Sequence, residues 1–351
     1  MPLVAHSALP SFERLRAEGM TVLDVGQATQ QDIRELHVGL LNMMPDGALE
    51  ATERQFFRLV GESNPIAQFY LHPFTLPELP RGPVAREHIV RHYESFEAIR
   101  EAGLDALIIT GANVTHDNLA DEAFWQPLIE VIGWASEHVT STLCSCLATH
   151  AVMQFKYGQP RVRQPRKIWG VFEHRVTDKR HPLVADINTR FDVPHSRWND
   201  VSRAQFEAAG VRVLAESAAA GVHLAVSPDG LRMVFFQGHP EYDTVSLLKE
   251  YKRDLGLAAA GHLTWPPFPE HYFNARAGAL MAEYGARLKA GETLEFPEAL
   301  VTPWLDNTWH DTAEAVIGNW MGCVYQVTHH DRRLPFKPGV DPAHPLDLPT
   351  G

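Results

Sequence analysis

The segment STLCSCLATH, residues 141–150, predicts a sharp turn from a buried strand into a helix. Residues 139–143 are apolar and β-branched enough for a buried strand, and residues 147–155 follow with helical spacing and small side chains. Cys146 lies at the junction, where free N–H groups and the positive end of the helix dipole favour a thiolate. We interpret Cys146 as a candidate nucleophile. A cysteine among apolar residues can also be an inert small hydrophobe, so this segment alone leaves both interpretations open.

Strands and helices alternate along the chain before this turn. Such alternation implies parallel strands joined by right-handed crossovers, and we therefore expect an α/β fold with a doubly wound, mostly parallel sheet. Reactive groups in these sheets gather at the carboxyl ends of the strands, which places residues 42–45, residues 111–116 and Cys146 on one edge. The expected strands cover residues 36–44, 66–70, 104–112 and 139–143, and the expected helices cover residues 48–60, 95–102 and 121–137.

The later part of the chain alternates less regularly. Residues 162–176 are basic and strand-like, whereas residues 193–200, VPHSRWND, are crowded with polar side chains and are expected to form a loop. A hairpin is expected over residues 221–243, because Pro228-Asp229-Gly230 separates two alternating strands. Helices are expected at residues 242–256, 275–290 and 313–327. We divide the chain into an N-terminal extension (1–34), an α/β catalytic core (35–260), a C-terminal helical extension of the same domain (261–334) and a proline-rich tail (335–351).

Composition limits the classes of function. The chain has 31 basic and 43 acidic residues and a formal net charge of -12, which argues against a nucleic-acid surface. Its three cysteines, Cys144, Cys146 and Cys323, are too few for a disulfide framework or a thiolate zinc site, and we expect a reducing, cytoplasmic compartment. The 19 histidines form no convincing metal motif. No apolar stretch approaches 18 residues, so neither export nor membrane insertion is expected.

A second group of reactive residues follows the hairpin. His239 and Glu241 are two positions apart at an expected strand end, and the strand period of two directs both side chains to the same side. A histidine beside a carboxylate is a general base with a stabilised imidazolium form, which a cysteine nucleophile needs. The alternative is a tight turn in which Glu241 only caps the backbone. Together with Cys146 the pair predicts a Cys-His-Glu triad, because geometry rather than sequence order defines such triads.

Several ordered segments carry a family resemblance. Over residues 35–330 the chain resembles the homoserine O-acyltransferase family of the glutamine-amidotransferase-like type. The resemblance rests on LLNMMPDGALEATERQFFRLV, ITGAN, STLCSCLATHAVM, RKIWGVFEH, VPHSRWNDV, QGHPEYD and NWMGCVYQVT. It implies a class I glutamine-amidotransferase-like, flavodoxin-like fold and a reaction between an acyl-coenzyme A (acyl-CoA) and L-homoserine, without a metal or a cofactor. A homodimer is possible.

The resemblance also implies roles for individual residues. Cys146 would be the acyl-thioester nucleophile, His239 the proton acceptor and Glu241 its partner. The residues expected to bind the amino-acid substrate are Lys167, Ser196 and Arg253. The chain departs from the usual pattern at Asn113, Leu147 and His150, where Pro, Trp and Gln are common, and these departures affect the acyl pocket rather than the triad. Cys144 is a further difference, interpreted as a buried strand residue or, alternatively, a redox group.

Thr115 bears on the choice of acyl donor. In the resembled family a glutamate at this position accompanies acetyl transfer, and a glycine accompanies succinyl transfer. A glutamate would repel the distal carboxylate of a succinyl group, whereas threonine is uncharged and can donate a hydrogen bond to it. Its bulk works in the other direction by narrowing the pocket. We predict that charge outweighs bulk and that succinyl-CoA is the donor.

Other functions stay open at this point. A homoserine O-acetyltransferase differs only in the donor. A glutamine amidotransferase shares fold and triad, but these enzymes usually carry glycine and glutamine where this chain has Ala148 and His150. A non-catalytic, redox-sensing module on the same fold is a third alternative, because a fold does not determine a function.

Overall fold

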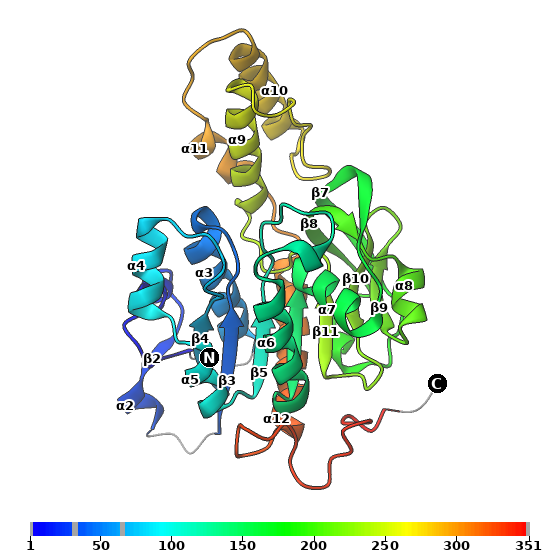
Figure 1. Cartoon of the computed structure of the whole chain (residues 1–351). Helices are drawn as coiled ribbons and strands as arrows, with labels where there is room; N and C mark the ends of the chain where they lie inside the picture. Colours follow the sequence, from blue (N-terminus) through cyan, green and yellow to red (C-terminus); the bar gives the residue numbers. More distant parts are fainter. Residues whose placement is uncertain (1–2, 30–33, 64–66, 349–351) are drawn as a thin grey trace.

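The computed structural model describes residues 3–29, 34–63 and 67–348, and in these residues eleven strands form one sheet (Figure 1). The strand order is β2-β1-β4-β3-β5-β6-β11-β10-β9-β7-β8. Neighbours from β2 through β11 pair in parallel, and those from β11 through β8 pair antiparallel. The strands are β1 Leu3–Ala5, β2 Val22–Asp24, β3 Glu35–Leu41, β4 Gln68–Phe74, β5 Ala106–Ile109, β6 Ser141–Ser145, β7 Val162–Val176, β8 Arg190–Asp200, β9 Arg212–Ser217, β10 Gly221–Val226 and β11 Met233–Phe236.

Helices cover both faces of this sheet, each over its own apolar core. On one face Phe56 of α3 and Trp320 of α12 are fully buried. On the other face Leu128 of α6 and Phe206 of α8 are fully buried. The prediction of a doubly wound, mostly parallel α/β sheet is therefore confirmed. The helices are α1 Pro10–Ala17, α2 Val25–Ala28, α3 Asp46–Glu62, α4 Pro83–His92, α5 Phe96–Ala102, α6 Trp125–His138, α7 Leu147–Tyr157, α8 Arg203–Ala208, α9 Ser246–Ala259, α10 Ala275–Lys289, α11 Glu298–Val301 and α12 His310–Val327.

The predicted elements of the parallel half agree with the structure. The strands expected at residues 36–44, 104–112 and 139–143 are β3, β5 and β6, each shifted or shortened by a few residues. The strand expected at residues 66–70 is β4, which begins at Gln68, and Ile66 lies outside the described residues. The hairpin expected around Pro228-Asp229-Gly230 is the antiparallel pair β10 and β11, with Val226 opposite Val234. Helix α4, helix α8 and strand β9 were not predicted.

The loop expected at residues 193–200 is wrong, because this segment belongs to β8 and pairs with β7 along its length. Phe191, Val193, His195 and Arg197 alternate along β8 and are buried. Two of these inward residues are polar, and they conceal the alternation by which a half-buried strand is recognised. Their partners inside the protein become important for the site.

Described segments near both ends of the chain pack against the central domain. Strand β1 pairs with β4 and β2 pairs with β1, so the expected N-terminal extension adds two strands to one edge of the sheet. In the proline-rich tail, Phe336, Val340 and Leu346 pack against the core on the α12 face.

A lobe formed by α9, α10 and α11 projects beyond the carboxyl edge of the parallel strands (Figure 1). Leu248 and Tyr251 of α9 pack with Met281 of α10 in an apolar cluster that also includes Trp169 of β7. Helix α12, by contrast, returns to the face of the sheet. The lobe therefore stands over the edge at which a doubly wound sheet carries its reactive groups. No helix in the described ranges has both the length and the apolar character needed to cross a membrane.

Candidate active site

Cys146 lies between β6 and α7 with a backbone conformation that L-residues rarely adopt. Its φ is 51° and its ψ is -106°, and its N–H donates to the carbonyl of Phe236 at the end of β11, 2.7 Å away. A non-glycine residue with positive φ in a tight turn is strained, and such strain is typical of functional sites. The expected strand-to-helix junction is confirmed, and it raises the thiol to the carboxyl edge of the sheet.

The surroundings separate this thiol from the other two. Cys146 is partly exposed, whereas Cys144 and Cys323 are buried, and burial raises the pKa of the Cys144 thiol far above its usual range. The N–H groups in the first turn of α7, from Leu147 onward, have no partner within the helix and face the same edge. Gly111, which follows β5, lies next to Cys146, because a Cβ built on it would be 3.9 Å from the cysteine Cβ. An acyl group on Cys146 would therefore be close to free N–H donors.

His239 and Glu241 follow β11, which is the parallel neighbour of β6. The Nδ1–H of His239 donates to Oε1 of Glu241 at 2.8 Å, and both side chains are buried. This contact leaves Nε2 as the nitrogen that can act on a second group, and the imidazole also makes side-chain contact with Cys146. Burial lowers the pKa of His239, but the charges of Glu241 and Cys146 outweigh it and raise the pKa well above the ordinary value. The structure thus brings all three predicted triad residues together.

A partly buried carboxylate, that of Glu250, lies beside this triad, and the sequence did not reveal it. Tyr242 stacks on the ring of His239, with 4.4 Å between ring centroids, and its hydroxyl donates to Oε1 of Glu250 at 2.8 Å. Lys167 lies 3.2 Å and Ser196 2.6 Å from Oε2 of the same carboxylate. Burial raises the pKa of Glu250, but the Lys167 charge and the bonds from Ser196 and Tyr242 lower it more, so the carboxylate is ionised.

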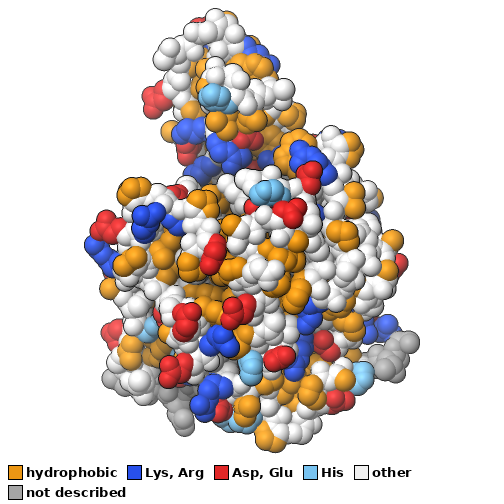
Figure 2. All heavy atoms as spheres, viewed as in Figure 1, with side chains coloured by type: hydrophobic (Ala, Val, Ile, Leu, Met, Phe, Trp, Pro, Cys, Tyr) orange, Lys and Arg blue, Asp and Glu red, His pale blue; other side chains and the backbone are white. Residues whose placement is uncertain are grey.

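These contacts place two of the three predicted substrate-binding residues. Lys167 comes from β7 and Ser196 from β8, and both reach Glu250 on α9, where the lobe meets the sheet. Glu250 gave no sequence signal, because it stands among charged residues on a helix and looks like part of a solvated face. Figure 2 shows Lys and Arg side chains gathered where the lobe joins the rest of the molecule.

Arg253, the third predicted residue, lies farther out. Its side chain is 59% exposed and pairs with the neighbouring Asp254. It follows Glu250 by three positions on α9, and residues at this spacing lie on the same side of a helix. Arg253 is therefore about one turn farther along the face that carries Glu250, and it contacts none of the triad residues.

Thr115 is in the exposed loop after β5. Its backbone N–H and that of His116 donate to Oε1 of Glu122, at 2.6 and 2.7 Å, and its hydroxyl lies 3.4 Å from Oε2. Burial raises the pKa of Glu122, but these bonds lower it more. Arg161 binds the loop from the other side through the carbonyls of His116 and Asp117, at 2.8 and 3.2 Å. The sequence did not predict that two charged side chains, Glu122 and Arg161, flank the Thr115 loop.

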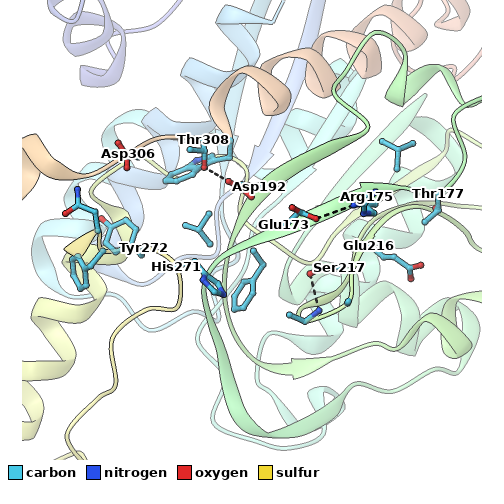
Figure 3. A pocket seen from close by; sticks show the side chains of 18 residues that line it. Glu173, Arg175, Thr177, Asp192, Glu216, Ser217, His271, Tyr272, Asp306 and Thr308 are labelled. Carbon is cyan, nitrogen blue, oxygen red and sulfur yellow. Dashed lines mark hydrogen bonds and ion pairs between the residues drawn. The ribbon is translucent and has the colours of Figure 1, made fainter. Parts of the chain in front are cut away.

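The cavities do not all coincide with this chemistry. A cavity of about 1110 Å³ lies between the β7–β8 hairpin and the start of the lobe, near His271 and Tyr272, and no triad residue lines it (Figure 3). A smaller cavity of about 370 Å³ is lined by Glu241 and Tyr242 together with Arg58 and Lys249. In residues 3–29, 34–63 and 67–348 no group of three or more His, Cys, Asp or Glu could hold a metal ion. We therefore define the site by its reactive residues and not by the volume of a cavity.

Comparisons with known proteins identify a family for this chain. The family model described as homoserine O-succinyltransferase matches residues 2–330. The chain is 79% identical to the homoserine O-succinyltransferase of Thiobacillus denitrificans, over 99% of this chain and 100% of that protein. It is 65% identical to the homoserine O-succinyltransferase of Allochromatium vinosum, over 100% of both chains. A glutamine amidotransferase structure from Methylobacillus flagellatus aligns with 83% of this chain and 95% of its own, at 11% identity and a TM-score of 0.45.

Proposed function

Because this chain belongs to the homoserine O-succinyltransferase family, we propose that it transfers a succinyl group from succinyl-CoA to the hydroxyl of L-homoserine. The products are O-succinylhomoserine and free coenzyme A, and the reaction serves methionine biosynthesis. The observation that carries the mechanism is the position of the strained Cys146 beside the His239–Glu241 pair.

In the first half-reaction the thiolate of Cys146 attacks the thioester carbonyl, after His239 has taken the thiol proton. A C–S bond forms at Cys146, and the bond to coenzyme A breaks as its thiolate leaves and takes the proton from the His239 imidazolium, which restores the neutral base. The N–H groups at the start of α7 stabilise the tetrahedral oxyanion, because they are fixed in position before charge develops. Glu241 stabilises the imidazolium form of His239 during this step.

In the second half-reaction His239 takes the proton of the homoserine hydroxyl, and the oxygen attacks the succinyl-cysteine. An ester bond forms, the thioester breaks, and the Cys146 thiolate is restored. Neither half-reaction needs a metal or a cofactor, since the thioester already activates the acyl group. Succinyl-CoA is a co-substrate.

Glu250, Lys167 and Ser196 are the proposed binding group for the acceptor. Homoserine carries an ammonium and a carboxylate, and an ionised carboxylate beside a lysine offers a partner for each. Lys167 and Ser196 both bind the Glu250 carboxylate here, so the acceptor would replace part of these two contacts. Ser196 can donate or accept as the substrate requires.

The donor preference rests on the loop that holds Thr115. The distal carboxylate of a succinyl group needs a positive or hydrogen-bonding partner. Thr115 is uncharged, and the guanidinium of Arg161 binds the same loop. Charge complementarity supports succinyl-CoA over acetyl-CoA, although the Glu122 carboxylate must stay engaged by the loop N–H groups for this to hold.

The same observations bear on the alternatives. A glutamine amidotransferase is disfavoured because His150, at the position where such enzymes usually have glutamine, is buried and bonded within the protein. A cytoplasmic location is proposed because the chemistry needs a reduced Cys146, and the three cysteines are free in the structure. A homodimer stays a prediction.

The direct test is release of coenzyme A from succinyl-CoA and from acetyl-CoA, each with homoserine and with serine as acceptor. We expect succinyl-CoA with homoserine to give the highest kcat/KM. A higher value with acetyl-CoA would overturn the donor assignment but keep the acyl transfer. No release with any of the four pairs would overturn the proposed function.

A further inference from the structure

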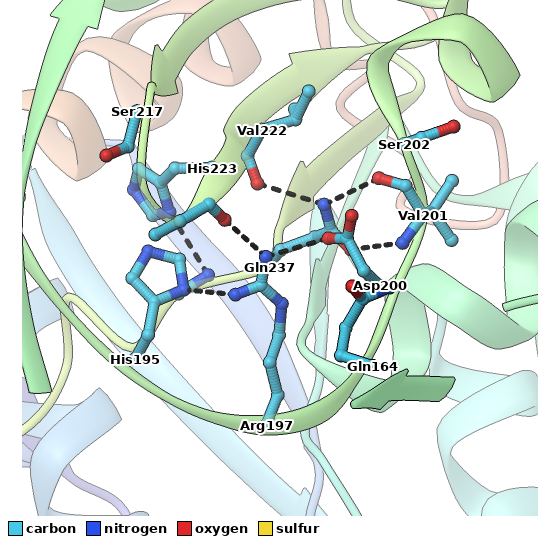
Figure 4. Close-up of polar contacts among 12 residues, drawn as sticks. Gln164, His195, Arg197, Asp200, Val201, Ser202, Ser217, Val222, His223 and Gln237 are labelled. Carbon is cyan, nitrogen blue, oxygen red and sulfur yellow. Dashed lines mark hydrogen bonds and ion pairs between the residues drawn. The ribbon is translucent and has the colours of Figure 1, made fainter. Parts of the chain in front are cut away.

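The side chain of Gln237, one residue after β11, is fully buried and points toward the backbone of Val201, just after β8, and of Val222 in β10 (Figure 4). Its Nε2 donates to the carbonyls of Val201 and Val222, at 3.0 and 2.9 Å. Its Oε1 accepts from the N–H of Val201 at 2.9 Å. The backbone partners therefore determine which end of the amide is oxygen and which is nitrogen.

This orientation also determines the proton position on His150. The Nε2 of His150 lies 3.1 Å from Oε1 of Gln237, and because that oxygen can only accept, Nε2 must carry the proton. Burial, together with the charge of Arg197, lowers the pKa of His150 to about 3, so the ring is the neutral Nε2–H tautomer. The charged or titratable groups around this contact are Arg197 of β8, Arg161 and, beyond Gln237, His239.

The contact joins the two halves of the proposed catalytic pair. His150 follows Cys146 by four positions, one turn of α7, and Gln237 precedes His239 by two positions. The hydroxyl of Thr149 lies 2.7 Å from the carbonyl of Cys144 on β6 and 3.1 Å from that of Phe236 on β11. The first turn of α7 is thus tied by its side chains to β6, to the end of β11 and to Gln237, which follows β11.

The chain on the other side of Gln237 is fixed as well. The N–H of Gly238 donates to Nδ1 of His223 at 3.3 Å, and the N–H of His239 donates to the carbonyl of Pro194 at 2.7 Å. A Cβ on Gly238 would lie 2.8 Å from the ring of His195, so only glycine fits at this position. The direction in which His239 leaves the strand is therefore set by its neighbours. On the other side, the Cys146 N–H holds the backbone of the nucleophile to Phe236, and the His150–Gln237 contact holds the turn of α7 that follows.

We propose that His150 is a positioning residue, which acts through Gln237 to hold the Cys146 thiol in line with the imidazole of His239. It touches neither substrate nor the reacting atoms. Its effect is on alignment, and small misplacements of a reacting pair cost much of the rate. The inference deepens the proposed function and rests on it for the roles of Cys146 and His239, but not for the identity of the acyl donor or acceptor.

The test compares His150→Leu and His150→Asn with His150→Gln. Leucine removes the hydrogen-bond donor. Asparagine keeps a polar amide, so it adds no apolar group, but its side chain is too short to reach Gln237. Glutamine can donate the same hydrogen bond. His181→Leu is the matched control, because His181 is also buried and bonded to a backbone carbonyl, that of Gly230, in the turn between β10 and β11.

The primary measurement is the rate of alkylation of Cys146 by iodoacetamide against pH, followed by peptide mass, because only the thiolate reacts. His150→Leu and His150→Asn should react about tenfold more slowly at neutral pH, with the midpoint of the pH profile moved upward. His150→Gln and His181→Leu should keep the unmodified profile, even though His181→Leu lowers the melting temperature. An unmodified profile in both donor-deficient variants, or an equal shift in His181→Leu, would overturn the proposal.

Alkylation needs neither acyl donor nor acceptor, so this result does not depend on which substrates the enzyme uses. In the coenzyme A release assay, His150→Asn should lower kcat with little change in the KM for homoserine. A raised KM with an unchanged kcat would show that His150 shapes the acceptor pocket instead, and would also overturn the proposal.

Discussion

Two groups of residues around the triad are held in different ways: the buried Gln237 and His150, which we place behind it, and the exposed Thr115 and Arg253, which we place in front of it. Behind the triad, hydrogen bonds join Gln237 to the backbone of Val201, to Val222 of β10 and to His150 of α7. In front of it, Thr115 lies in an exposed loop, and Arg253 pairs only with its neighbour in sequence. A buried polar network fixes geometry, because breaking any contact leaves a group unsatisfied, whereas an exposed side chain can move at little cost. Changes behind the triad should therefore alter the chemical step and stability, and changes in front should alter substrate choice.

The largest expected effect comes from Cys146→Ala, which removes the nucleophile. Incubation of the unmodified protein with succinyl-CoA alone should add one succinyl mass, and Cys146→Ala should abolish the adduct and lower transfer by several orders of magnitude. Intact-protein mass spectrometry measures the adduct.

Cys144→Ala is the control, because Cys144 is two positions away on the same segment but buried in the core. It should still form the adduct. An adduct that persists in Cys146→Ala would show that Cys146 is not the nucleophile. The division into residues behind and in front of the triad would then lose its basis.

The second prediction concerns the loss of stability of the folded protein in acid, which its buried histidines cause. Burial is the main cause that lowers the pKa of His150 to about 3, and of His174 and His181 to about 4, from an ordinary value of 6.5. Below pH 6.5 the unfolded chain binds protons that the folded chain rejects, so stability is present above that pH and is lost toward pH 4. Each such histidine contributes a slope of about 1.4 kcal/mol per pH unit to the free energy of unfolding.

Urea unfolding between pH 7.5 and 5 measures this slope. His181→Gln should reduce it by the share of one histidine, and the free energy of the unmodified protein should change little between pH 7.5 and 8.5 on account of these residues. If His181→Gln leaves the slope unchanged, the ring accepts a proton in the folded protein and the buried region is less rigid than its hydrogen bonds indicate.

The same division explains what the sequence could predict. Period and turn residues were sufficient for β3, β5, β6 and α7, and hence for the edge on which Cys146 lies. The His239–Glu241 pair was predicted from the strand period of two, but β11 ends at Phe236 and the contact forms in the turn that follows the strand. Residues that act through contacts distant in sequence gave no such signal.

Glu250 and Gln237 are the clearest examples of this limit. Glu250 gains its side-chain partners only because β7 and β8 bring Lys167 and Ser196 to α9. Gln237 is an ordinary polar residue in the sequence, and its role depends on Val201, Val222 and His150 from three other segments. The inward polar residues of β8 even concealed the strand itself. Such roles are properties of the fold, and periodicity cannot express them.

In front of the triad, Thr115→Glu should change the donor preference. A new carboxylate at this loop would repel the distal carboxylate of succinyl-CoA and leave acetyl-CoA unaffected. The ratio of kcat/KM for succinyl-CoA to that for acetyl-CoA should fall about tenfold, which corresponds to about 1.4 kcal/mol. Thr115→Gln is the control, because it adds similar bulk without charge. An equal fall in Thr115→Gln would show that pocket size and not charge selects the donor.

The smallest effect is expected for Arg253→Ala. Its guanidinium is largely exposed and already paired with Asp254, so any bond to the homoserine carboxylate competes with water and with that pair. Exposed ion pairs contribute about 0 to 1 kcal/mol, which predicts a rise of up to about fivefold in the KM for homoserine with little change in acyl-enzyme formation. Glu250→Gln, one turn earlier on α9, should raise the same KM more, because the Glu250 side chain is only 15% exposed and its charge is less screened by water. If Arg253→Ala proved the more damaging of the two, the lobe would have to close over the bound acceptor and bury Arg253 during turnover. The exposed position of Arg253 would then describe only the substrate-free enzyme.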